Sequence, residues 1–254
     1  MAFIQCGFHS DVLGRACAMN VILPQKVKTQ IGMTSSGSGR KDYPVVYLLH
    51  GLSDDHTIWS RRSSIERYAA EYEVAVVMPN GERGFYTDMI EGYRYWTMLS
   101  EELPEIVCNL FPVSPRREDT FAAGLSMGGG GTAVYALRHP ELFGSACSMS
   151  GLLDMFPGRR SYDNAFQQSV ADNSPVALLR GMTAEQLDGV RSVRWWVDCG
   201  DDDFLWKCNV DFYTLMRERD IPLQYRMRDG GHTWRYWQTV LPDALTFVSN
   251  GFGK

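Results

Sequence analysis

The stretch from Thr120 to Thr132, which reads TFAAGLSMGGGGT, constrains the fold more than any other part of the chain. Small apolar residues precede Ser126 and are typical of a short buried strand, whereas residues 132–138 are typical of a helix. The five residues around Ser126 match G-x-S-x-G, the pattern of a serine on a sharp strand-to-helix turn above the end of a sheet. Glycines are needed there because a Cβ would collide with the neighbouring strand or helix. The motif therefore predicts an exposed nucleophile, Ser126, at the edge of a sheet.

Two other interpretations of this motif have to be weighed. A phosphate-binding loop would need a Lys-Ser/Thr pair after the glycines or the spacing G-x-G-x-x-G, and neither is present. The second interpretation is a glycine-rich turn whose serine has no catalytic role. It stays open until a base, an acid and oxyanion-hole donors are found elsewhere in the chain.

The pattern of strands and helices indicates one α/β domain. The chain has 254 residues, which suits one large domain or two small ones. Apolar runs typical of buried parallel strands alternate with helical patterns and include residues 43–50, 73–79, 145–150 and 193–199. Two antiparallel strands are expected in residues 3–24, and helices are expected over residues 57–72 and 96–111. We therefore expect one doubly wound α/β domain with a mostly parallel sheet over residues 1–254, with residues 151–182 as a small cap insertion.

Charge and cysteine usage exclude several classes of protein. The formal net charge of −5 and the lack of a basic stripe argue against binding to nucleic acid. No apolar run approaches the ~18 residues that a membrane span requires. The six cysteines show no C-x-x-C spacing, which favours reduced thiols. The N-terminal residues lack the pattern of a secretory signal, so a cytoplasmic protein is expected.

A serine hydroxyl needs a neighbouring imidazole to take its proton, and that imidazole needs a carboxylate to hold its tautomer. His232 is the best candidate for the base, because it follows a late strand and two glycines and precedes the final helix. The other four histidines lie early in the chain, on surface turns, at a helix end or beside the loop at residues 50–52.

Three adjacent aspartates compete for the role of the acid, at Asp201, Asp202 and Asp203. Three such charges repel one another, so at least one is expected to have a partner. Asp203 is predicted to turn inward because the apolar pair Phe204–Leu205 follows it, whereas the other two suit solvent or a helix cap. Serine, aspartate and histidine then follow one another in the order of the α/β-hydrolases, not that of trypsin or subtilisin.

Two backbone amides are expected to form an oxyanion hole. Gly51 lies just past the strand at residues 43–50 and lets the chain turn across the top of the sheet, which frees the amide of Leu52. The second donor is the amide of Met127, directly after the nucleophile. Loss of one such donor typically costs ~10²–10³ in rate.

Five stretches, which with the strand pattern cover nearly the whole chain, carry a resemblance to a known family: LLHGLSDDHTIW (48–59), GYRYWTMLSEELPEIV (92–107), REDTFAAGLSMGGGGT (117–132), CGDDDFL (199–205) and GGHTW (230–234). The chain resembles the esterase D family of α/β-hydrolases, and within it the small bacterial tributyrin-type carboxylesterases. The GLSMGG and SEELP stretches are specific to that family, whereas G-x-S-x-G alone is not.

The resemblance implies roles for individual residues of this chain. The nucleophile would be Ser126, the base His232 and the acid Asp203. The amides of Leu52 and Met127 would form the oxyanion hole. Trp96 and Tyr86 would lie near the acyl or alcohol pocket. No metal or organic cofactor is required, and the family, in which oligomers are common, allows a homo-oligomer. S-formylglutathione hydrolases are also relatives, but this chain lacks their cysteine-containing stretch in the oxyanion loop.

The sequence therefore predicts a serine carboxylesterase that hydrolyses small-molecule esters with a short acyl or small aryl group through an acyl-enzyme. Three alternatives stay open: a feruloyl or acetyl-polysaccharide esterase, a thioesterase or acyltransferase of the same family, and a non-catalytic binding module of the same fold. The binding module would be expected to have lost one of the three side chains, and all three are present.

Overall fold

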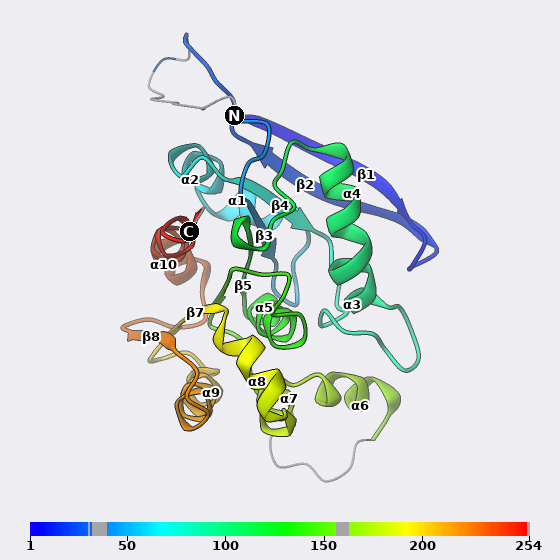
Figure 1. Cartoon of the computed structure of the whole chain (residues 1–254), viewed down its shortest axis with the longest axis vertical. Coiled ribbons are helices and arrows are strands. Elements are labelled where there is room, and N and C mark those ends of the chain that lie inside the picture. The colour runs from blue at the N-terminus through cyan, green and yellow to red at the C-terminus, as the bar shows by residue number, and fades with distance from the viewer. Residues whose placement is uncertain (30, 32–39, 156–162, 253–254) are drawn as a thin grey trace.

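The computed structural model describes residues 1–29, 31, 40–155 and 163–252 (Figure 1). One sheet contains eight strands in the spatial order β1-β2-β4-β3-β5-β6-β7-β8. Their bounds are β1 (Ala2–Ser10), β2 (Arg15–Leu23), β3 (Val45–Leu49), β4 (Ala75–Pro79), β5 (Thr120–Leu125), β6 (Ser145–Met149), β7 (Arg194–Gly200) and β8 (Leu223–Arg228). β1 and β2 pair antiparallel, β2 pairs antiparallel with β4, and the remaining neighbours are parallel. The predicted fold class, including the antiparallel N-terminal strands, is confirmed.

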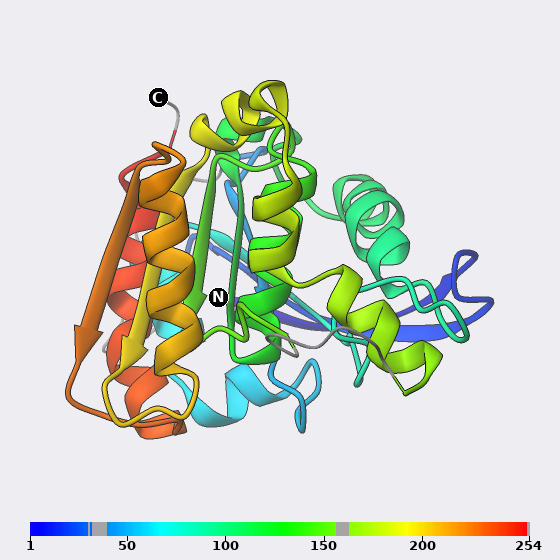
Figure 2. The ribbon, with the colours of Figure 1, turned by 90° about the horizontal axis from the view of Figure 1, so that it is seen from below.

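The burial of each strand follows from its place in the sheet. Every residue of β3, β4 and β6 is buried, as expected for central strands covered on both faces. Burial alternates along the edge strand β1, whose outward-facing side chains contact solvent. The parallel strands bring their carboxyl ends to one edge, the lower one in Figure 2. The loops that leave this edge are the ones that carry the predicted site residues.

Helices cover both faces of the sheet. Their bounds are α1 (Ile58–Arg62), α2 (Ile65–Glu71), α3 (Tyr95–Thr97), α4 (Leu103–Leu110), α5 (Met127–Arg138), α6 (Ala165–Asp172), α7 (Pro175–Gly181), α8 (Ala184–Arg191), α9 (Trp206–Glu218) and α10 (Trp234–Ser249). Apolar side chains of α1, α2 and α10 form the core on one face, and those of α3, α4, α5, α7, α8 and α9 form the core on the other. None of the helices in the described ranges combines the length and apolar character that crossing a bilayer requires.

Two predicted helices differ from the observed ones. The helix expected over residues 57–72 is split, because Ser63 adopts an extended conformation between α1 and α2. Its hydroxyl and its amide both donate to the carbonyl oxygen of Trp59, which closes α1 early. The helix expected over residues 96–111 contains a π-helical turn, Met98–Glu102, between α3 and α4, and Pro104 lies in the first turn of α4.

The predicted cap, residues 151–182, falls partly outside the described residues, at 156–162. Within the described part, α6 packs on the loop that follows β4. Ser169 Oγ accepts a hydrogen bond of 2.8 Å from the amide of Ile90, and the ring of Phe166 meets that of Phe85 edge-on at 5.5 Å. This contact places α6 beside the loop that borders the predicted site. Its role as a cap stays a prediction.

Candidate active site

Ser126 lies on a strained turn between β5 and α5. Its φ of 54° and ψ of −118° fall in a region that L-residues rarely occupy. A Cβ on Gly124 would come within 2.4 Å of the carbonyl oxygen of Gly128, and a Cβ on Gly128 within 2.4 Å of that of Leu49. Both glycines are therefore required by close backbone contacts. Ser126 itself is partly exposed, although its neighbours from Phe121 onward are buried.

The structure brings Ser126, His232 and Asp203 together from three loops. His232 Nε2 lies 3.0 Å from Ser126 Oγ. Nδ1 of the same ring lies 2.8 Å from Oδ2 and 3.0 Å from Oδ1 of Asp203. Since Nδ1–H donates to the carboxylate, Nε2 is the nitrogen left to accept the serine proton. Asp203 is fully buried, and the His232 side chain is 17% exposed. The arrangement can deprotonate the serine hydroxyl and stabilise the resulting imidazolium.

The charge of Asp203 is held by hydrogen bonds. Burial raises the pKa of this carboxyl, but hydrogen bonds from His232, the Leu205 amide and Ser150 outweigh burial and leave its pKa below the ordinary value. The Leu205 amide donates to Oδ1 over 2.8 Å. Asp203 is therefore a carboxylate at neutral pH, as a partner for an imidazolium has to be.

Packing fixes the orientation of the imidazole. The edge of the Trp237 ring meets the His232 ring at 4.8 Å and 88°. Trp237 Nε1 donates to Ser150 Oγ over 3.0 Å, which ties this tryptophan to the loop after β6. On another side, the Phe204 ring lies with its centroid 4.4 Å from that of His232. The imidazole is thus held by aromatic contacts as well as by the carboxylate.

The amides of Leu52 and Met127 are free to bind an oxyanion. Within the described residues, neither amide donates to any acceptor. Met127 is the first residue of α5, where amides lack an intrahelical partner and the helix dipole favours negative charge. Gly51, next to Leu52, approaches the nucleophile so closely that a Cβ there would lie 3.7 Å from Ser126 Cβ. Both predicted donors therefore come from segments that adjoin Ser126.

His50 shapes the loop that carries Leu52. Its Nδ1 donates to the carbonyl oxygen of Gly51 over 2.8 Å, and its Nε2 accepts from the amide of Gly81 over 3.0 Å. Burial lowers the pKa of His50, so the ring is neutral and both contacts persist at neutral pH. This histidine therefore holds the loop that carries Leu52.

The two predicted pocket aromatics have packing roles. Tyr86 is fully buried, donates to the carbonyl oxygen of His50 over 2.9 Å, and fills the space that a Cβ on Gly131 would need. Trp96 is 9% exposed and stacks on His139 at 5.4 Å, at the end of α5 remote from Ser126. The structure places Tyr86 against the loop that carries Leu52 and does not bring Trp96 to the nucleophile.

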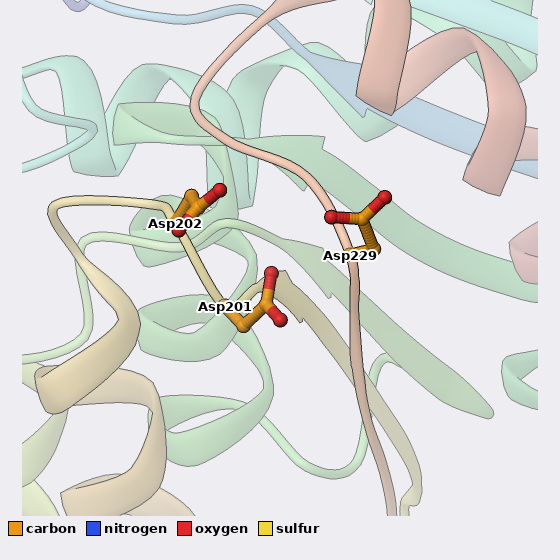
Figure 3. Close-up of side chains that lie close together, drawn as sticks. All are labelled: Asp201, Asp202 and Asp229. Carbon is orange, nitrogen blue, oxygen red and sulfur yellow. The ribbon is translucent and has the colours of Figure 1, made fainter.

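The other two aspartates of the DDD run are exposed, as predicted. Their carboxylates and that of Asp229 lie within 4.8 Å of one another (Figure 3). Asp201 Oδ1 accepts a hydrogen bond of 3.1 Å from the amide of Gly230. The side chain of Asp201 therefore links the loop that bears Asp203 to the loop that bears His232.

Phe204 is a site residue that the sequence did not assign. It had served only as the apolar neighbour that would turn Asp203 inward. Asp203 is indeed buried, but the Phe204 side chain is 74% exposed and lies against His232. The sequence feature that could have identified Phe204 is a bulky apolar residue directly after the acid.

Comparison with known proteins places the whole chain among esterases. Residues 10–248 match the family model named Esterase. An acetyl esterase from Caldicellulosiruptor saccharolyticus is 26% identical over 266 residues, which cover 98% of each chain. An S-formylglutathione hydrolase from Paracoccus denitrificans is 28% identical over 243 residues, which cover 83% of each.

Solved structures show the same similarity. A ferulic acid esterase superposes with a TM-score of 0.86 at 34% identity, covering 99% of this chain and 98% of the other. FphF, a fluorophosphonate-binding serine hydrolase from Staphylococcus aureus, superposes with a TM-score of 0.84 at 31% identity, covering 98% of both. The similarity thus spans nearly the whole chain.

Proposed function

The chain belongs to the Esterase family, and on this premise we propose that it is a serine carboxylesterase that hydrolyses short-chain acyl or small aryl esters. The observation that carries the proposal is the continuous hydrogen-bonded chain from Ser126 through His232 to Asp203, with its contacts of 3.0 and 2.8 Å. A serine, an imidazole and a carboxylate that are hydrogen-bonded in this order form the arrangement that acyl transfer to serine uses.

In the proposed mechanism, His232 Nε2 takes the proton of Ser126 as Oγ attacks the ester carbonyl carbon. The developing oxyanion is stabilised by the amides of Leu52 and Met127, which have no other acceptor in the described structure. The tetrahedral intermediate collapses, the C–O bond to the alcohol breaks, and His232 gives its proton to the leaving oxygen. Water, deprotonated by the same imidazole, then releases the acid and restores the serine.

The substrate class is inferred from the relatives. The printed names include an acetyl esterase, a ferulic acid esterase and S-formylglutathione hydrolases, whose reactions share cleavage of an acyl bond with different leaving groups. Similarity to the ferulic acid esterase at 34% identity favours a feruloyl or acetyl-polysaccharide ester as the second candidate.

The decisive experiment is hydrolysis of a p-nitrophenyl ester series from acetate to dodecanoate by the wild type and by Ser126→Ala. We expect the wild type to be fastest on the short chains and the variant to lose about 10⁶ in kcat, because serine and imidazole act as one unit. Ser64→Ala is the matched control, since Ser64 caps α2 without a side-chain hydrogen bond.

Two results would contradict the proposal. A Ser126→Ala variant that keeps the wild-type rate would mean that another group is the nucleophile. A wild type that hydrolyses no ester in the series, but transfers an acyl group to an added alcohol, would replace hydrolysis by acyl transfer.

A further inference from the structure

We propose that Phe204 is the platform for the leaving group, and that the ester is formed with a neutral alcohol that carries a six-membered ring, either an aryl or a pyranose ring. The inference rests on the proposed function and adds to it the alcohol side of the substrate.

The exposure of Phe204 is the first observation. Its side chain is 74% exposed, more than any other aromatic side chain in the described ranges. A phenyl ring left in water does not gain the favourable free energy that its burial would contribute. A molecule that covers the exposed face of this ring would supply that contribution.

The turn that orders the acid also holds Phe204 outward. Asp203 Oδ1 accepts from the Leu205 amide, and the backbone carbonyl of Asp203 accepts from the Trp206 amide over 2.9 Å. With Asp203 fully buried on one side of this turn, the next side chain points away from the core. Phe204 is therefore fixed in place by the same hydrogen bonds that position the carboxylate.

Its position relative to His232 assigns it to the leaving group. The imidazole has to pass the serine proton to the leaving oxygen, so the alcohol lies on the side of the serine that faces His232. The Phe204 ring stands against this imidazole, with 4.4 Å between centroids and a tilt of 48°. A ring attached to the ester oxygen is thus within reach of the exposed phenyl face.

The chemistry of this surface selects the class of alcohol. A phenyl face stacks on aryl rings and on the C–H face of a pyranose, whereas a short linear alkyl group covers little of it. Three carboxylates, of Asp201, Asp202 and Asp229, are exposed on the adjoining loops and repel an anionic leaving group. A neutral ring satisfies both conditions.

The test keeps the acyl group constant and varies the alcohol. Phenyl acetate, methyl 4-O-acetyl-β-xylopyranoside and ethyl acetate are hydrolysed by the wild type and by Phe204→Ala, and kcat/KM is compared within each ester so that intrinsic reactivity cancels. We expect the variant to lose about tenfold on at least one ring ester and less than about twofold on ethyl acetate. The ring ester that loses most identifies the source of the ring.

Two further variants test the interpretation. Trp206→Ala removes a neighbouring ring that is 45% exposed and has no ring contact with His232 within the described residues, so we expect no change in the ratio between esters. Phe204→Tyr keeps a ring face and should keep the wild-type ratio. Thermal unfolding of each variant verifies the fold.

An equal loss on all three esters would show that Phe204 only orients His232, and no loss on any would show that the ring is idle; either result overturns the inference. A wild type inactive on all three esters would instead overturn the proposed function, and this is measured before any variant.

Discussion

Two buried aspartates on either side of the end of β7 show how differently the fold treats the same side chain. Asp198 lies within β7 and Asp203 in the loop that follows, and both are fully buried. Asp198 accepts a hydrogen bond from the Tyr236 hydroxyl and lies 2.8 Å from Nη2 of Arg228. Asp203 accepts hydrogen bonds from Nδ1 of His232 and from the Leu205 amide.

The pKa values of the two carboxyls move in opposite directions. Burial raises the pKa of Asp198, and the bonds from Tyr236 and Arg228 do not overcome this effect. Burial acts in the same direction on Asp203, but its hydrogen bonds lower the pKa below the ordinary value. Burial alone therefore does not determine the charge of a carboxyl; the donors placed around it do. Asp198 links β7 to Tyr236 and Arg228, whereas Asp203 contacts the imidazole of the proposed mechanism.

The largest expected effect is that of Asp203→Asn. The amide cannot hold the imidazole in the required tautomer or stabilise its charged form, so kcat/KM on phenyl acetate should fall by about 10⁴. Asp202→Asn is the matched control on the same loop, with an exposed side chain and an expected change within about threefold. Equal losses in both variants would mean that loop charge, and not the contact with His232, governs the rate.

The second effect is a loss of stability in Asp198→Asn. An amide nitrogen would face Arg228, so we expect the free energy of unfolding at about pH 5 to fall by roughly 1–3 kcal/mol while kcat/KM changes less than tenfold. Urea denaturation and the phenyl acetate assay measure the two quantities. If activity were lost without a loss of stability, Asp198 would belong to the site and the contrast with Asp203 would disappear.

The smallest effect is the pH dependence of stability, which should have opposite signs at the two positions. The pKa of Asp203 is lowered in the folded state, so its stabilising contribution is present above the ordinary value of 3.8 and is lost as pH falls through the folded-state pKa. The pKa of Asp198 is raised, so its contribution is present at low pH and declines as pH rises from 3.8 through the folded-state pKa.

The wild type is compared with each of the two asparagine variants by urea denaturation at a series of pH values. The asparagine does not titrate at the substituted position. The stability difference should grow with pH for Asp203→Asn and shrink with pH for Asp198→Asn. Slopes of the same sign would contradict the assignment of the two carboxyls to different environments.

The fold and the core of the candidate site could be predicted because some backbone conformations allow only certain residue types, which are visible in the sequence. Gly124 and Gly128 have no space for a Cβ, and that requirement fixes the turn at Ser126. The run of three aspartates indicated that at least one has a partner, since like charges repel, and the apolar pair after Asp203 indicated which one is buried.

What the sequence could not supply depends on which way a side chain points. Phe204 is as apolar as a core residue, and only the turn around Asp203 sends it outward. Trp96 was expected near the pocket from the resemblance alone, yet it stacks on His139 at the end of α5 remote from Ser126. The break at Ser63 also depends on a local hydrogen bond to Trp59 that competes with the helix.

The backbone of Ser126 has a consequence for how this chain responds to selection in the laboratory. Holding a serine at a φ of 54° costs about 1–3 kcal/mol, and glycine would adopt the same conformation without that cost. A library screened for heat resistance alone would therefore favour Ser126→Gly, a variant that keeps the architecture and lacks the nucleophile. Any attempt to make this protein more robust has to be screened for turnover at the same time, since its most reactive position is also one where the native residue opposes folding.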